Sequence, residues 1–160
     1  MVSARSPVLP FDPDAAFPSP APTAISSLRV LVVDNDADTA DSFALLIKRW
    51  GYDVMSCYSA AEAQRLAKAC DPDVALIDIG LPVTDGYHLA RWFRVEPRME
   101  RTQLIAVTGF GQETDRRRSQ EAGFDLHLVK PVNPRQLREL LAERAVTAAQ
   151  QPRPAPQLAP

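Results

Sequence analysis

Residues 74–86 read VALIDIGLPVTDG, and this stretch decides the fold. It begins with a short apolar run, reaches an acid at Asp78, and passes through Gly80 and Pro82 to Asp85, which can cap a helix. An uninterrupted apolar run of this length is typical of a strand buried on both faces of a parallel sheet. The stretch therefore predicts a buried strand, a polar group at its carboxyl end, and a helix beyond it.

Four similar runs lie on either side of this stretch, and each is followed by a segment with helical spacing. The five predicted strands are Leu28–Val33, Asp53–Cys57, Asp73–Ile77, Gln103–Val107 and Asp125–Val129. Strands that alternate with helices predict a parallel sheet with helices on both faces, which is a doubly wound α/β domain. The first, third and fourth strands are the most apolar and belong in the middle of the sheet, whereas Asp53–Cys57 is mixed and suits an edge.

The segments between the strands carry signals for the ends of helices. Ser59 begins a capping box, and Asn133 followed by proline is a good helix start. Gly51 and Gly123 stand where the preceding helices would end, because glycine readily adopts the left-handed conformation that closes a helix. These signals place one helix after each strand.

Proline marks the ends of the folded domain. The chain has 160 residues and fifteen prolines, six of them in residues 1–26 and four in residues 152–160. We expect disordered Pro-rich tails over 1–26 and 150–160, because neither can bury enough apolar surface to offset its ordering entropy. The single folded domain is then predicted over 27–149. A docking peptide for an SH3-like partner is the alternative for the tails, and composition favours a plain linker.

The bulk composition argues against several functional classes. A net charge of -2 does not point to nucleic acid or to an anionic membrane, and the basic run Arg116–Arg118 has acids around it, as a solvated helix face does. No apolar run approaches the about 20 residues of a membrane-spanning helix, and the N-terminus lacks the apolar core of a signal peptide. Cys57 and Cys70 have no metal-ligand spacing and fit reduced thiols. We therefore expect a cytoplasmic protein.

Polar residues of different kinds follow four of the predicted strands. The first strand leads into Asp34-Asn35-Asp36, the third into Asp78, the fourth into Thr108 and the fifth into Lys130. In open parallel sheets, ligands bind outside the carboxyl ends of the strands, so these groups are expected at one rim. A single acid there would be an ordinary helix cap, but carboxylates, a hydroxyl and an amine together are hard to explain by capping alone.

This combination suits phosphoryl transfer to a carboxylate. A carboxylate oxygen can attack phosphorus and form an acyl phosphate. Magnesium, which prefers oxygen ligands, can bridge the carboxylates and the incoming phosphoryl group. A lysine neutralises one phosphoryl oxygen and a threonine hydroxyl donates a hydrogen bond to another, so that catalysis is mostly positioning and electrostatics.

Several motifs carry a resemblance to a known family. They are VLVVD at 30–34, LIDIGLP at 76–82, VTG at 107–109, AGFD at 122–125 and LVKP at 128–131. In order and spacing they resemble the receiver domains of bacterial two-component response regulators, most closely the receivers of hybrid histidine kinases. The resemblance covers about Leu28 to Ala145, and it implies a flavodoxin-like (βα)5 fold with strand order 2-1-3-4-5.

The resemblance also assigns roles at the rim. It makes Asp78 the phosphoacceptor, Thr108 the switch hydroxyl and Lys130 the phosphate-binding lysine, with a cis peptide between Lys130 and the next proline. It places magnesium in an acidic pocket made by Asp34, Asp78 and the backbone carbonyl of Gly80.

The pattern leaves the roles of the residues after Asp34 and of His127 open. Receivers usually carry two adjacent acids after the first strand, but the second of these is Asn35 here, which offers a carbonyl oxygen without charge. Either Asn35 or Asp36 is then the remaining candidate ligand, unless Asp36 caps the following helix. His127 stands where receivers place a residue whose rotamer reports phosphorylation, and a half-buried histidine without a role is an equal alternative.

The resemblance implies partners as well. The phosphoryl donor would be a histidine kinase or a histidine phosphotransfer protein. We also expect a downstream protein partner on the face built by Gln112–Ala122, the fifth strand and the helix after Asn133, because Thr108 and Lys130 lead directly into these elements. A homodimer would be compatible with this arrangement. The chain would not be an enzyme beyond assisting its own phosphorylation and dephosphorylation.

Two other functions compete with this interpretation. The same fold could serve as a pseudo-receiver, a phosphorylation-independent interaction module, because Asn35 weakens the acidic pocket. A flavodoxin-like flavin binder would need a phosphate-cradling loop after the first strand, whereas residues 34–37 form an acidic loop that repels phosphate unless a cation intervenes.

Overall fold

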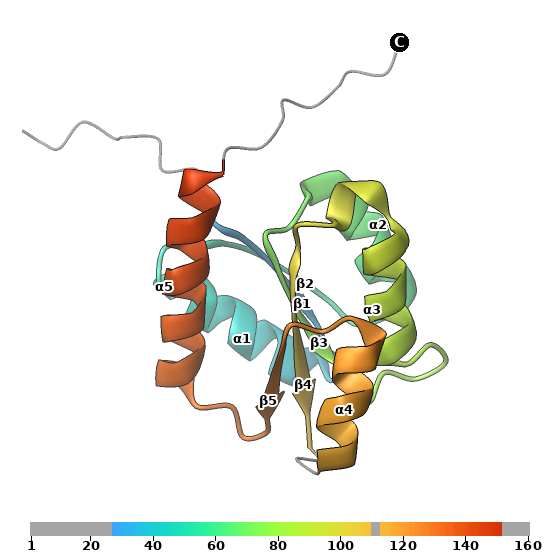
Figure 1. Cartoon of the computed structure of the whole chain (residues 1–160). Helices are drawn as coiled ribbons and strands as arrows, with labels where there is room; N and C mark the ends of the chain where they lie inside the picture. Colours follow the sequence, from blue (N-terminus) through green and yellow to red (C-terminus); the bar gives the residue numbers. More distant parts are fainter. Residues whose placement is uncertain (1–26, 110–112, 152–160) are drawn as a thin grey trace, which may run out of the picture.

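The computed structural model describes residues 27–109 and 113–151 of the chain. Residues 1–26 and 152–160, which make up nearly all of the predicted tails, lie outside the described residues, as does Gln112, the predicted first residue of the polar helix. Both ends of the described chain lie at the same end of the sheet, away from the carboxyl ends of the strands (Figure 1). Among the described residues, no helix is both long and apolar enough to cross a membrane.

All five strands belong to one parallel sheet with the order β2-β1-β3-β4-β5. They are β1 (Arg29–Val33), β2 (Asp53–Cys57), β3 (Val74–Asp78), β4 (Gln103–Thr108) and β5 (Leu126–Val129). The predicted doubly wound α/β class, the strand order and the edge position of β2 are confirmed. Asp78 and Thr108 are the last residues of their strands and not the first residues beyond them, because the ladder pairs Asp78 with Val107 and Thr108 with Val129.

Helices cover both faces of the sheet. They are α1 (Ala37–Arg49), α2 (Ala60–Cys70), α3 (Gly86–Val95), the short 3-10 helix η1 (Pro97–Met99), α4 (Glu113–Ala122) and α5 (Pro134–Gln150). Helices α1 and α5 lie on one face, while α2, α3 and α4 lie on the other (Figure 1). Each crossover therefore returns the chain to start the next parallel strand, which brings all carboxyl ends of the strands to one rim.

Two apolar clusters fill the spaces between the layers. Along β1, Val30 and Val32 face the cluster under α1 and α5, whereas Leu31 and Val33 face the cluster under α2, α3 and α4. Side chains alternate between the two faces of a strand, so a strand covered on both sides must be apolar throughout. This is why the central strands are continuous apolar runs in the sequence.

Polar side chains fix the first turns of the helices. Asp36 caps α1, accepting hydrogen bonds from the backbone N–H groups of Asp38 at 3.0 Å and Thr39 at 3.3 Å. Asp85 caps α3 and Asn133 caps α5, as the sequence predicts. These caps set the points at which the chain leaves the rim and enters each helix.

Candidate functional site

Lys130 joins two strand ends that are far apart in the sequence. Its Nζ donates a hydrogen bond to Oδ2 of Asp34 at 2.8 Å, and it lies 3.8 Å from Oδ1 of Asp78. Asp34 follows β1, Asp78 ends β3 and Lys130 follows β5. The structure thus brings the predicted phosphoacceptor, the predicted lysine and the first acidic residue into one cluster.

Asp78 stands at the centre of the rim, on the middle strand of the sheet. Its Oδ1 accepts a hydrogen bond from the backbone N–H of Gly80 at 3.1 Å. Partial burial is the largest influence on its pKa and raises it, and the charge of Asp34 raises it further, while the Gly80 N–H and Lys130 act in the opposite direction. The net result is a carboxyl group with a raised pKa, which is a pattern seen at functional sites.

Two glycines shape the chain beside Asp78. A Cβ on Gly80 would lie 3.6 Å from both carboxylate oxygens of Asp78, so the absence of a side chain leaves one approach to the carboxylate open. A Cβ on Gly86 would lie only 2.7 Å from the backbone oxygen of Asp78, which means that only glycine lets α3 begin so close to the strand.

Lys130 carries the positive charge of this cluster. Its partial burial alone would lower its pKa, but the hydrogen bond to Asp34 and the charges of Asp78, Asp34 and Asp36 more than offset this, so that the pKa of Lys130 is raised. The lysine therefore stays protonated at neutral pH. The peptide bond between Lys130 and Pro131 is cis, as the family resemblance predicts.

Thr108 lies at the same rim, on the strand next to Asp78. The residue is buried, and its backbone carbonyl accepts a hydrogen bond from the N–H of Lys130 at 2.8 Å. The exits of β4 and β5 are therefore tied together by the main chain.

Asn35 and Asp36 follow Asp34 directly and lead into α1. Both are exposed, and the Asp36 side chain is occupied in capping α1, which was the second of its two predicted roles. Its backbone N–H donates to Oδ1 of Asp34 at 2.9 Å. Across residues 27–109 and 113–151, no three Asp, Glu, His or Cys residues are grouped so as to hold a metal ion.

His127 connects β5 to α4. Its Nδ1 lies 3.1 Å from Oγ of Ser119, and that hydroxyl donates its single proton to the backbone oxygen of Asp115 at 2.8 Å. Ser119 thus links the histidine ring to the backbone of α4. The Nε2 atom is buried and has no hydrogen-bond partner among the described residues. Ser119 could not be predicted as a partner of His127 from the sequence, because a residue on a helix and one eight positions on in a strand have no local pattern.

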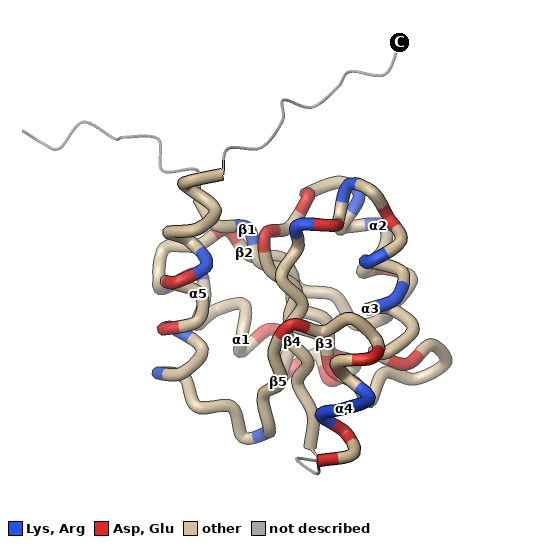
Figure 2. Tube along the Cα trace, in the orientation of Figure 1, with Lys and Arg blue, Asp and Glu red and all other residues tan. Residues whose placement is uncertain are grey.

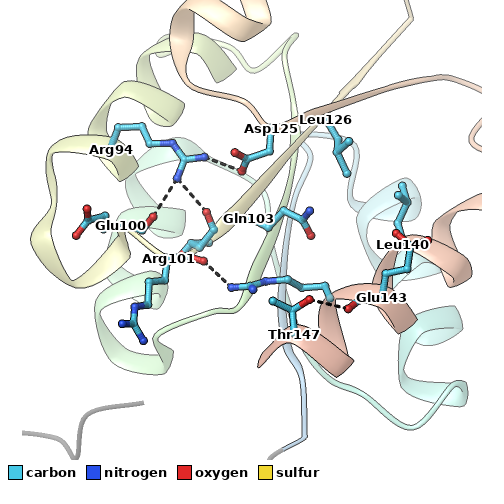
Figure 3. A pocket seen from close by; sticks show the side chains of 11 residues that line it. Arg94, Glu100, Arg101, Gln103, Asp125, Leu126, Leu140, Glu143 and Thr147 are labelled. Carbon is cyan, nitrogen blue, oxygen red and sulfur yellow. Dashed lines mark hydrogen bonds and ion pairs between the residues drawn. The ribbon is translucent and has the colours of Figure 1, made fainter. Parts of the chain in front are cut away.

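A second polar region lies at the opposite end of the sheet, around a pocket of about 430 Å³. Figure 3 shows the guanidinium of Arg94 directed at Asp125 there, with a separation of 2.7 Å. The same group donates to the backbone oxygens of Gly123 at 2.8 Å and Thr102 at 3.0 Å. None of the predicted site residues lines this pocket. Arg94 joins the end of α3 to the turns that precede β4 and β5.

The family model for the response regulator receiver domain matches residues 30–142, which contain every candidate site residue. The chain belongs to this family. Receiver domains of this kind are in general signalling switches and not enzymes, and they generally bind Mg²⁺ in an acidic pocket. They interact with histidine kinases or phosphotransfer proteins and with downstream partners.

Individual relatives agree with this membership. An uncharacterized 14.6 kDa protein of Leptolyngbya boryana is 32% identical over 119 residues, which cover 74% of this chain and 91% of the relative. The polar-differentiation response regulator DivK of Brucella ovis is 30% identical over 104 residues, covering 65% and 85% of the two chains.

Solved structures give the same result. A CheY-like receiver domain protein from Methanospirillum hungatei is 31% identical with a TM-score of 0.69, and the match covers 79% of this chain and 99% of that one. A response regulator structure from Chloroflexus aurantiacus is 28% identical with a TM-score of 0.70, and the match covers 75% and 98% of the two chains.

Proposed function

We propose that this receiver domain accepts a phosphoryl group on Asp78 from the phosphohistidine of a histidine kinase or a histidine phosphotransfer protein, in the cytoplasm. The observation that supports it most is the position of Lys130. Its ammonium group is hydrogen-bonded to Asp34 at 2.8 Å and lies 3.8 Å from the Asp78 carboxylate. A cation held there can neutralise a phosphoryl oxygen on Asp78 without a change in the fold.

The chain's residues can be assigned to the steps of this transfer. An ionised oxygen of Asp78 attacks phosphorus, the bond from phosphorus to the donor's imidazole nitrogen breaks, and the imidazole leaves with the electron pair. The raised pKa of Asp78 makes its oxygen a more basic nucleophile. Lys130 neutralises one phosphoryl oxygen and the Thr108 hydroxyl donates to another, so the product is an acyl phosphate that both residues hold.

The donor set at the rim fits Mg²⁺. The carboxylates of Asp34 and Asp78 and the carbonyl oxygen of Gly80 would hold the ion, with water completing its shell, since magnesium is commonly bound by one or two carboxylates. When bound, the ion would supply positive charge that offsets the negative charge of the carboxylates and of the phosphoryl group. Because Asp36 caps α1, Asn35 is the better candidate for a further ligand, and a neutral ligand there predicts weak affinity.

The phosphorylated state would be read by a protein partner on the face made by α4, β5 and α5. Thr108 and Lys130 both touch the proposed phosphoryl position and lead into these elements, and His127 bonds β5 to α4 through Ser119. A homodimer through this face is one form such a complex can take.

A specific observation also favours a second candidate, the pseudo-receiver. The described residues contain no three-residue acidic cluster, and Asn35 removes one negative charge from the family's usual pocket. If phosphorylation does not occur, the same surface would act as a phosphorylation-independent interaction module.

Phosphorylation by acetyl phosphate in the presence of Mg²⁺, followed by intact-mass measurement, tests the proposal. We expect a single phosphoryl adduct on the wild-type protein and none on Asp78→Asn. The matched control is Asp53→Asn, the same chemical change at an exposed residue of β2, and it should keep the adduct. A full adduct on Asp78→Asn would refute the assignment. A wild-type protein that takes no phosphoryl group from acetyl phosphate or from a kinase would favour the pseudo-receiver.

A further inference from the structure

Val83 has an unusual backbone conformation in the loop between β3 and α3. Its φ is 67°, and the only other non-glycine residue with positive φ in the described chain is Asp71. The N–H of Thr84 donates to the carbonyl of Pro82 at 2.8 Å, so the chain makes a tight γ-turn around Val83. A β-branched residue is disfavoured in this conformation, which glycine and asparagine adopt far more readily.

No packing inside the domain compensates for this conformation. The Val83 side chain has a relative exposure of 108%, the highest of the exposed large hydrophobic residues. The loop around it is nevertheless fixed. Leu81 is buried in the core, and the N–H of Gly86 donates to the carbonyl of Ile79 at 3.1 Å. The loop therefore holds an apolar side chain out into solvent at a defined place.

That place lies beside the phosphoacceptor. Gly86 starts so close to β3 that its Cβ would be 2.7 Å from the backbone oxygen of Asp78, and Val83 is three residues away from it, at most about 11 Å along the chain. A protein interface of ordinary size covers about 800 Å² on each partner, a patch of roughly 16 Å radius. A protein docked over Asp78 can therefore reach Val83, whereas a small phosphodonor cannot.

The surrounding rim is polar, which makes the apolar side chain stand out. Asn35, Asp36 and Gly80 are exposed, and Asp85 occupies the next helix cap. In Figure 1 the light-green loop that carries Val83 projects from the body of the domain beside α3. The neighbouring Pro82 is also exposed. An apolar group at the edge of a polar site is suited to an apolar recess in a partner and not to a polar substrate.

We infer that Val83 is an apolar contact for the protein that delivers the phosphoryl group to Asp78. The inference rests on the proposed function. Strained residues persist where they serve a site, and here the partner would cover the side chain that the domain leaves exposed. The partner is a protein with a surface phosphohistidine and an apolar recess next to it. Val83 then determines which protein donors the domain accepts, without taking part in the chemistry.

A comparison of two kinds of phosphodonor distinguishes a docking role of Val83 from a role in the chemistry at Asp78. The small donor is acetyl phosphate. The protein donors are autophosphorylated histidine kinases from the genome that encodes the chain. The kinase used is the one that transfers its phosphoryl group to the wild-type domain fastest. The test variant Val83→Asn removes the apolar group and tolerates positive φ. Val83→Leu keeps an apolar group, and Val95→Asn is the control, since Val95 is exposed at the far end of α3.

We expect Val83→Asn to lower kcat/KM for transfer from the kinase by about tenfold, mainly through KM, as the loss of one good apolar contact does. Its rate with acetyl phosphate should stay within about twofold of the wild-type rate, and its Tm should not fall, because asparagine relieves the backbone strain. Val83→Leu and Val95→Asn should transfer at nearly the wild-type rate with both donors.

Several results would overturn the inference. Unchanged transfer from the kinase to Val83→Asn would do so, and so would equal slowing with both donors, which would mean that Val83 supports the site itself. A wild-type dimer that Val83→Asn dissociates would identify a second copy of the chain as the occupant instead. If acetyl phosphate modifies Asp78 but no kinase does, Val83 serves no protein donor, and if neither donor modifies Asp78, the proposed function fails as well.

Discussion

Lys130 sets the electrostatic balance of the rim at the scale of single residues. One ammonium group stands against two carboxylates, and it makes its short contact with Asp34 and not with Asp78. Asp78 is therefore left incompletely neutralised, which agrees with its raised pKa. Phosphorylation of Asp78 would add further negative charge at this point, so Lys130 and a bound cation would be needed to balance it.

The raised pKa of Asp78 leads to a prediction about stability. A folded-state pKa above the ordinary carboxyl value means that the folded protein holds this proton more tightly, so the ionised form opposes folding. We expect Asp78→Asn to increase the free energy of unfolding at pH 7. The gain should shrink as the pH falls through the raised pKa, and vanish below the ordinary pKa of 3.8, where the carboxyl is protonated in both states.

Urea denaturation of both proteins between pH 7 and pH 4 measures this difference. Asp53→Asn on the exposed part of β2 is the control, and it should show no such gain. A variant at position 78 that is less stable than the wild-type protein at pH 7 would contradict the electrostatic account.

Asn35 leads to a prediction about metal affinity. Asn35→Asp would place a negative charge beside the proposed Mg²⁺ site, and one such charge at about 4 Å from a divalent ion in water contributes about 2 kcal/mol. We expect Mg²⁺ to bind at least about tenfold more tightly, measured by calorimetric titration or by tryptophan fluorescence. Asn35→Ala, which removes the amide oxygen, should not tighten binding. Unchanged affinity in Asn35→Asp would show that the ion is held by other groups.

At the scale of elements, α4 is the helix least anchored by apolar packing. Figure 2 shows acidic and basic residues close together along its length. Only Ser119 and Ala122 are buried in it, and the Arg118 guanidinium lies over the Tyr87 ring at 4.9 Å. A helix with few buried contacts costs little to shift, which suits an element that changes between two positions.

The C-terminal end of α4 is held more firmly than the rest of the helix. Gly123 follows the helix with φ of 103°, and its carbonyl accepts the 2.8 Å hydrogen bond from Arg94. A Cβ at this position would lie 2.7 Å from Cγ of Arg94. The glycine is therefore required both for its backbone conformation and for the space that the arginine occupies.

Two glycine substitutions separate these effects. Gly51 also has positive φ, 91°, but a Cβ there would meet nothing within 4 Å. We expect Gly51→Ala to lower the free energy of unfolding by about 1 kcal/mol, from the backbone alone. Gly123→Ala should lower it by about 2–3 kcal/mol, because Arg94 must also move. Urea denaturation measures both, and equal losses would show that the contact with Arg94 does not matter.

At the scale of the whole molecule, the proposed site and the Arg94 pocket lie at opposite ends of the sheet, with α4 running between them. Its first turn is near the exits of β4 and β5, and its end is clamped by Arg94. The layout favours movement at the rim end of the helix while the other end stays fixed. The switch would then be a local change on a rigid sheet.

Amide hydrogen exchange with and without a phosphoryl mimic on Asp78 tests this layout. We expect the mimic to change exchange in Glu113–Ala122, in Leu126–Val129 and at the start of α5, since these elements follow Thr108 and Lys130. The Asp78→Asn protein with the same mimic is the control and should show no change. Changes confined to α1 or α2, on the far side of the site, would exclude this output face.

The sequence by itself determined the fold and the composition of the rim. Hydrophobic runs and caps are local signals, so residues 74–86 and the similar segments around them fixed five strand–helix units. Parallel connections then required the ends of the strands to meet, which predicted that Asp34, Asp78, Thr108 and Lys130 share one rim. No knowledge of side-chain contacts was needed for either result.

Only the tertiary structure decided how these groups are paired. The bond from Lys130 to Asp34 joins residues 96 positions apart, and that from Arg94 to Gly123 joins residues 29 apart. Neither has a local pattern, because each depends on distances through space that follow from packing of the whole sheet. The exposed, left-handed Val83 was equally invisible in the sequence, since its conformation is imposed by the closure of the loop around it.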